Sequence, residues 1–123
     1  MIWCYSNQLP ELVRTYLSLG QQSIVLNIFR QENKDTTNDC LYKYATVSLK
    51  PPKLDYKVLM NAIIRLEYSV DDMQTIQNNY LLDQEDEEAK KDFLRMQEYR
   101  KESKQEAIKC MEYIEEHNLW KGS

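Results

Sequence analysis

Glycine is almost absent from this sequence, with Gly20 and Gly122 its only two occurrences in 123 residues. Nucleotide-binding loops need several closely spaced glycines, because side chains would keep the backbone N–H groups away from a phosphate. A calcium-binding loop also needs a glycine at its sharp bend. The scarcity of glycine therefore excludes the common nucleotide-binding motifs and argues against a calcium site in the acidic run 83–88.

Histidine and cysteine are also scarce. His117 is the only histidine, and its place near the end of the chain is a poor one for a general base. Cys4, Cys40 and Cys110 are widely scattered, form no C-x-x-C pair and match no zinc spacing with His117. We therefore expect no enzymatic activity, no metal and no cofactor. The odd cysteine count indicates reduced thiols inside a cell.

Long apolar runs and a basic surface are missing as well. No stretch approaches the roughly 18 consecutive apolar residues of a membrane span, and residues 1–5 lack the pattern of a signal peptide. The formal net charge is −4, whereas nucleic-acid binding needs clustered positive charge. We therefore expect a soluble protein that is kept in the cytoplasm or in an assembly formed there. Neither a membrane nor a nucleic acid is an expected partner.

Two segments have the composition of β-strands. Residues 23–29 are apolar and β-branched, and residues 40–49 alternate between two faces. In the second segment, one face would carry the apolar side chains Leu41, Ala45, Val47 and Leu49, and the other would carry Tyr42, Tyr44, Thr46 and Ser48. The polar stretch 31–39 predicts a long hairpin connection between them. Residues 2–5 could add a third strand, while residues 9–19 are ambiguous and fit a short helix.

The apolar period becomes helical after Pro51–Pro52. Asp55 is the expected N-cap of a first short helix, and Ser69 with Asp72 has the spacing of a capping box for a second. A long charged helix should follow from about residue 85 to about residue 117. Its apolar seam is weak at the centre, so two alternatives stay open. The helix either projects from the domain, or it bends or breaks and folds back over the sheet.

Aromatic side chains supply the positive signal, with nine tyrosines and two tryptophans. Tyrosine and tryptophan are enriched where proteins meet, since each has an apolar body and a polar tip. The alternative is that several of them simply cover a thin core. Trp3 and Trp120 lie near the two ends of the chain. The candidate interaction residues are Trp3, Tyr42, Tyr44, Phe93, Met96 and Tyr99.

The order of several motifs points to a family resemblance. The motifs are Tyr42-Lys43-Tyr44, Asp55-Tyr56, and the helical patterns of residues 62–69, 73–83 and 93–107. Over residues 40–110 this pattern resembles small uncharacterised proteins of phages and prophages of gut Bacteroidales, often encoded near virion and tail genes. The resemblance implies a phage origin and a virion-associated role. It supplies no catalytic residue.

These observations predict a single α+β domain over residues 1–123. It should have a small antiparallel sheet of two or three strands in residues 1–50, two short helices in 55–82, and one long charged C-terminal helix in 85–117. The expected function is that of a non-enzymatic phage structural or assembly protein that binds a virion subunit or itself, with a homo-oligomer among the expectations. The alternative is a small regulatory or anti-defence protein that sequesters a host protein. The expected location is the cytoplasm of the bacterial host or the assembled virion.

Overall fold

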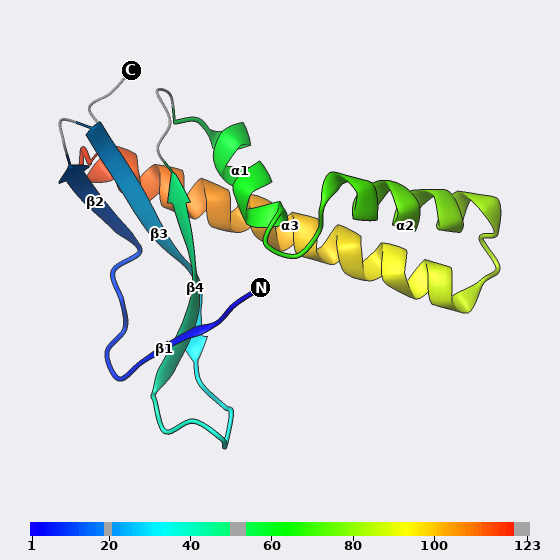
Figure 1. Cartoon of the computed structure of the whole chain (residues 1–123), viewed down its shortest axis with the longest axis horizontal. Helices are drawn as coiled ribbons and strands as arrows, with labels where there is room; N and C mark the ends of the chain where they lie inside the picture. Colours follow the sequence, from blue (N-terminus) through cyan, green and yellow to red (C-terminus); the bar gives the residue numbers. More distant parts are fainter. Residues whose placement is uncertain (19–20, 50–53, 120–123) are drawn as a thin grey trace.

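The computed structural model describes residues 1–18, 21–49 and 54–119, and places four strands before three helices (Figure 1). The strands are β1 (Cys4–Ser6), β2 (Val13–Ser18), β3 (Gln21–Glu32) and β4 (Tyr42–Leu49). The helices are α1 (Tyr56–Ile64), α2 (Val70–Leu82) and α3 (Glu87–Glu116). The predicted α+β class is confirmed, but the sheet has four strands instead of two or three. Pro51–Pro52 and Trp120 lie outside the described residues.

The four strands form one antiparallel sheet in the order β1-β4-β3-β2. Strand β3 has 12 residues and pairs with both β2 and β4. Its register with β4 shifts between Ile28 and Gln31, where Phe29 has a φ of 53°. A positive φ is rare for a bulky side chain, and here it accompanies the irregularity that bends the strand.

Residues 13–18 form strand β2, so the interpretation of residues 9–19 as a short helix was wrong. The apolar positions there fit a helix and a strand almost equally well. What decides the outcome is pairing with β3, in a regular register from Val13 opposite Leu26 to Ser18 opposite Gln21. Valine and threonine at alternate positions favour that pleated arrangement. A contact with another strand has thus overridden an ambiguous local pattern.

Two of the three helices pack on one face of the sheet, whereas α2 lies beyond the sheet (Figure 1). Helix α1 and the C-terminal half of α3 cover the core, and both contribute fully buried side chains to it. The buried core cluster consists of Leu12, Val13, Ile24, Leu26, Ile28, Ala45, Val47, Leu59, Ile63, Ala107, Cys110 and Ile114. The predicted alternation of residues 40–49 holds for Ala45 and Val47, but Leu41 is 61% exposed because it precedes the strand.

Helix α3 is one unbroken helix of 30 residues, on the order of 45 Å long. Its C-terminal half crosses the sheet, and its N-terminal half extends beyond the sheet beside the antiparallel helix α2 (Figure 1). The N-terminal half therefore projects from the domain, as in the first alternative, whereas the C-terminal half covers the sheet without the break that the second alternative expected. Neither α3 nor any other described helix is long and apolar enough to cross a membrane.

The helix starts follow the predicted caps. The Val58 N–H donates to Asp55 Oδ1 at 2.9 Å, which opens α1. At the start of α2 the Asp72 N–H donates to Ser69 Oγ at 3.0 Å, and the Ser69 N–H donates to Asp72 Oδ2 at 3.3 Å. This reciprocal pair is the expected capping box. Helix α3 begins after Asp86, within two residues of the expected start.

Candidate interaction surfaces

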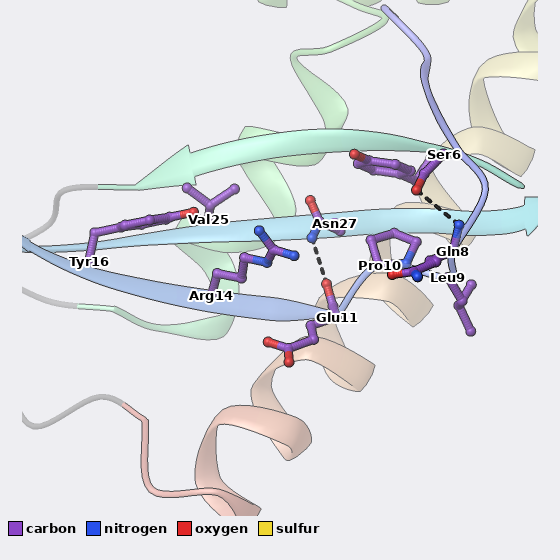
Figure 2. Close-up of a pocket in the computed structure, with 10 residues that line it drawn as sticks. Ser6, Gln8, Leu9, Pro10, Glu11, Arg14, Tyr16, Val25 and Asn27 are labelled. Atoms are coloured by element: carbon purple, nitrogen blue, oxygen red, sulfur yellow. Dashed lines mark hydrogen bonds between the residues drawn. The ribbon is translucent and has the colours of Figure 1, made fainter. Parts of the chain in front are cut away.

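The sheet face opposite the helices carries no other element of the described chain (Figure 1). We call it the open face, and we define it by Arg14, Tyr16, Val25, Tyr44 and Thr46. Strand alternation puts these side chains opposite the buried ones, and Figure 2 shows Arg14, Tyr16 and Val25 on the same side of the sheet. Tyr16 is 49% exposed. The open face therefore combines aromatic, aliphatic and polar groups on a flat support.

A groove of about 340 Å³ lies at one end of the open face (Figure 2). Its floor comes from strands β2, β3 and β4, and its wall comes from the segment before β2. The lining residues are Ser6, Gln8, Leu9, Pro10, Glu11, Arg14, Tyr16, Val25, Asn27 and Tyr44. These residues include no histidine or cysteine, and they suit polar and aromatic contacts better than acid–base chemistry.

Hydrogen bonds hold the wall of the groove in place. The buried Asn27 donates its side-chain Nδ2–H to the Glu11 carbonyl at 2.6 Å, and its backbone N–H to the Leu12 carbonyl at 2.8 Å. Arg30 Nη1 donates to the Pro10 carbonyl at 2.8 Å. Since these bonds reach residues that the strands do not pair, the segment is fixed before any ligand arrives. A preformed wall lowers the ordering cost of binding.

The second surface belongs to a helical arm, defined as residues 69–97, which comprises α2 and the N-terminal part of α3. This arm holds eight Asp/Glu and three Lys/Arg, a net charge of −5 in a chain whose total is −4. Leu81 and Leu82 at the end of α2 are 67% and 85% exposed. Inside the arm, the rings of Tyr80 and Phe93 stack at 4.4 Å with an interplanar angle of 5°.

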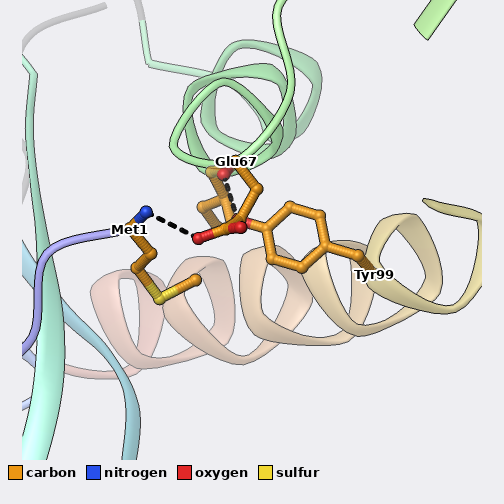
Figure 3. Close-up of polar contacts among 4 residues, drawn as sticks. Met1, Glu67 and Tyr99 are labelled. Carbon is orange, nitrogen blue, oxygen red and sulfur yellow. Dashed lines mark hydrogen bonds and ion pairs between the residues drawn. The ribbon is translucent and has the colours of Figure 1, made fainter. Parts of the chain in front are cut away.

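An aromatic cluster lies where the arm meets the rest of the molecule. The Tyr99 ring lies 6.0 Å from Phe29 and 5.7 Å from Tyr68, between centroids. Its hydroxyl donates to the Ile63 carbonyl at 2.6 Å, and beside it the Met1 amino group forms an ion pair with Glu67 at 2.6 Å (Figure 3). Burial raises the pKa of Tyr99 to about 12. Phe29, at the register shift in β3, thus packs the sheet against the helices through its contact with Tyr99.

The structure separates the six candidate interaction residues. Tyr44 lines the groove on the open face, whereas Trp3 lies against Lys43, whose Nζ is 4.7 Å from the ring centroid. Tyr42 is half-buried on β4.

The three candidates on α3 point inward to different degrees. Met96 is fully buried, so it cannot form part of a surface. Phe93 and Tyr99 are half-buried, and their rings pack against Tyr80 and against Phe29 and Tyr68. The apolar side chains of residues 93–99 therefore serve internal packing, because α2, the end of α1 and Tyr68 already cover them.

Sequence reasoning missed the contribution of β2 to the open face. Arg14 and Tyr16 lie on the face with Tyr44, but a helical interpretation of residues 9–19 placed them nowhere near it. The available signal was weak: two β-branched residues at alternate positions, Val13 and Thr15, close to the β-branched run at residues 23–29. An antiparallel pair of strands over residues 13–18 and 21–32 would have been the matching prediction.

The remaining reactive groups are dispersed. In the described ranges, no three His, Cys, Asp or Glu side chains come together in a way that could hold a metal ion. His117 stacks on Tyr113 at 4.1 Å, and its Nδ1 lies 3.0 Å from the Tyr113 carbonyl. Burial raises the pKa of the Cys110 thiol to about 12, which makes it a poor nucleophile.

The chain was also compared with known proteins. No protein-family model, no curated protein and no solved structure matches it.

Proposed function

We propose that this protein is a non-enzymatic structural or assembly protein that acts by binding another protein through its open face. The observation that carries the proposal is a sheet face that no described helix covers, beside a groove whose wall is fixed by hydrogen bonds. Most two-layer domains expose one sheet face to water, but here that face carries two tyrosines, a valine and an arginine. Such a mixture is typical of protein interfaces.

The chemistry of the groove supports a protein as the occupant. Tyr16 and Tyr44 offer ring surface together with hydroxyl groups, and Arg14 offers five N–H donors. Arginine and tyrosine are also the residue types that most often carry binding energy in interfaces. The flat open face next to the groove suits an extended partner surface better than a small molecule, which prefers an enclosed apolar pocket.

The resemblance to phage proteins gives the partner its class. We propose a virion or tail subunit as the partner, so that the protein would work in the host cytoplasm during assembly or within the particle. The host-directed alternative makes a different prediction, since its open face would bind a host protein in infected cells before particles appear.

Site-specific photocrosslinking tests the proposal directly. A benzophenone amino acid replaces Tyr44 on the open face in one variant and Gln77, which is exposed on α2, in a matched control. After irradiation of infected cells, the Tyr44 variant should form a discrete adduct with one virion subunit, and the Gln77 variant should not. An adduct with a host protein would favour the regulatory alternative. No adduct at Tyr44, or the same adducts at both positions, would refute the proposed use of the open face.

A further inference from the structure

Strand β2 forms a complete and regular edge of the sheet. It has six residues, pairs along its whole length with β3, and has no neighbour on its other side among the described residues. The opposite edge is different. Strand β1 has three residues and pairs only with residues 42–44 of β4. The rest of that sheet edge is formed by β4 itself.

Proteins usually protect an exposed edge strand from pairing with another chain. The common devices are a proline, a bulge, a lysine or an inward-pointing charge on the strand, or a very short edge. Strand β2 contains no proline and no lysine, and its register with β3 has no shift. Its one charged residue is Arg14, which lies on the open face and does not point into the core. The edge is therefore ready to pair.

The hydrogen bonds to β3 identify the backbone groups that point outward. The Asn27 N–H donates to the Leu12 carbonyl, so Leu12 is bonded toward β3. Bonding alternates along an antiparallel strand, and the next residues bonded toward β3 are therefore Arg14 and Tyr16. The N–H and C=O groups of Val13, Thr15 and Leu17 point away from the sheet. No described backbone or side-chain group bonds to them.

We propose that the occupant of this edge is a second copy of the same chain, with the two β2 strands antiparallel about a two-fold axis at Thr15. In this register Thr15 faces Thr15 of the second copy, and Val13 faces Leu17 of the second copy, so all outward groups find partners. Shifting the axis by one residue would leave one end of the strand unpaired. It would also place Arg14 opposite Arg14, or Tyr16 opposite Tyr16.

The side chains on the open face favour the same register. With the axis at Thr15, Arg14 of each copy lies opposite Tyr16 of the other. Both side chains are exposed in the single chain and lie on the same side of the sheet (Figure 2). An arginine over a tyrosine ring makes a favourable cation–π contact, and the two-fold axis makes it twice. Two four-stranded sheets become one sheet of eight strands, with the two open faces joined into one surface.

Charge substitution at Thr15 tests the pairing. Thr15 is exposed, so Thr15→Lys and Thr15→Glu should each leave the single chain folded. Each variant would bring like charges together at the axis, which should weaken dimerisation by about tenfold or more. An equimolar mixture of the two variants should form a heterodimer, because opposite charges then meet. Thr46→Lys, at an exposed threonine on the inner strand β4, is the matched control and should dimerise like the wild type.

Light scattering coupled to size exclusion gives the mass, and circular dichroism checks the fold of each variant. The expected result is a wild-type dimer, two monomeric Thr15 variants and recovery of the dimer in their mixture. A wild-type protein that stays monomeric at about 0.5 mM would overturn the proposal, because even a weak dimer would form at that concentration. A dimer that survives both Thr15 substitutions would overturn it as well.

Amide hydrogen exchange tests the register residue by residue. Arg14 and Tyr16 should be protected at every protein concentration, since their N–H groups bond to β3. Val13, Thr15 and Leu17 should become protected only at concentrations where the dimer forms. Fast exchange of these three amides in a dimeric sample would show that another surface makes the contact and would refute this inference.

This inference is independent of the photocrosslinking result. The outward backbone groups of β2 and the Tyr44 side chain on β4 are different points of contact, and Thr15→Lys leaves Tyr44 unchanged. A monomer that still forms the Tyr44 adduct would disprove the dimer and keep the proposed function. A dimer that forms no Tyr44 adduct would support the pairing of the β2 strands and refute the proposed use of the open face.

Discussion

The body of the molecule, meaning all described residues outside the arm, and the arm itself are stabilised in different ways. The body holds the sheet, α1 and the C-terminal half of α3, with their shared core. In the arm only Ala89 and Met96 are buried, and α2 has no buried residue. The arm carries a net charge of −5, so the remainder of the chain has a net charge of +1.

This difference means that the two regions should respond differently to the same kind of damage. The body depends on removing apolar surface from water, and its elements share one core, so it should unfold as a unit. The arm depends on helix caps, on one aromatic stack and on contacts between α2 and α3. Regions with few buried contacts open locally at a lower free energy than the global one.

The largest expected loss of stability comes from a substitution at the centre of the sheet. Leu26 is fully buried on β3, and Leu26→Ala should lower the free energy of unfolding by about 2–5 kcal/mol through lost burial and a cavity. Urea denaturation followed by circular dichroism measures this loss. The matched control is Leu82→Ala in the arm, where the side chain is 85% exposed, and its effect should stay within about 0.5 kcal/mol. Equal losses of unfolding free energy in the two variants would contradict the difference between body and arm.

A substitution in the arm should destabilise the protein less, and its effect should stay confined to the arm. Phe93 is half-buried and stacks on Tyr80, so Phe93→Ala should cost about 2 kcal/mol from lost apolar burial and ring contact. We expect faster amide exchange throughout α2, with unchanged exchange in the central residues of β3. Leu94→Ala, at a neighbouring side chain that is 55% exposed, serves as the control. If β3 amides also lost protection, the arm would be part of the same cooperative unit as the body.

The N-caps of α1 and α2 allow the same comparison with one kind of substitution, the removal of a capping side chain. Ser69→Ala removes the cap of α2, and Asp55→Ala removes the cap of α1, each at about 1 kcal/mol. Because α1 carries Leu59 and Ile63 into the core, the Asp55 variant should lower the denaturation midpoint of the whole protein. The Ser69 variant should change only the exchange rates of α2 amides. Similar midpoint shifts in both variants would show that α2 contributes to global stability.

The sequence predicted the local features well and the contacts between elements poorly. The caps at Asp55 and Ser69 and the long helix were all predictable, because they depend on residues close in sequence. Strand β2 was not, since its pattern suits a helix until β3 pairs with it. The inward position of Met96 was also missed, because a helical seam looks the same whether it faces its own α2 or a partner. The open face could be foreseen only in part, from Tyr44 on β4.

The smallest effect concerns alkaline pH and the contact between arm and body. Burial raises the pKa of Tyr99 from an ordinary value of 10.0 to about 12, so the unfolded chain loses this proton at a lower pH than the folded one. Its contribution to stability is therefore complete below pH 10 and is lost as the pH rises toward 12. The buried Cys110 shifts in the same direction, from 9.0 to about 12. Thermal unfolding of the wild type should thus be flat from pH 7 to 8.5 and should fall above pH 9.

Single substitutions separate the two groups. Tyr99→Phe loses the hydrogen bond to the Ile63 carbonyl, which should cost about 1 kcal/mol at neutral pH, but it also removes the proton that titrates. The difference between this variant and the wild type should therefore shrink as the pH rises above 10. Cys110→Ala should remove the earlier part of the decline, which begins near pH 9. If the Tyr99→Phe curve stayed parallel to that of the wild type at all pH values, Tyr99 would titrate normally and its ring would not be held between arm and body.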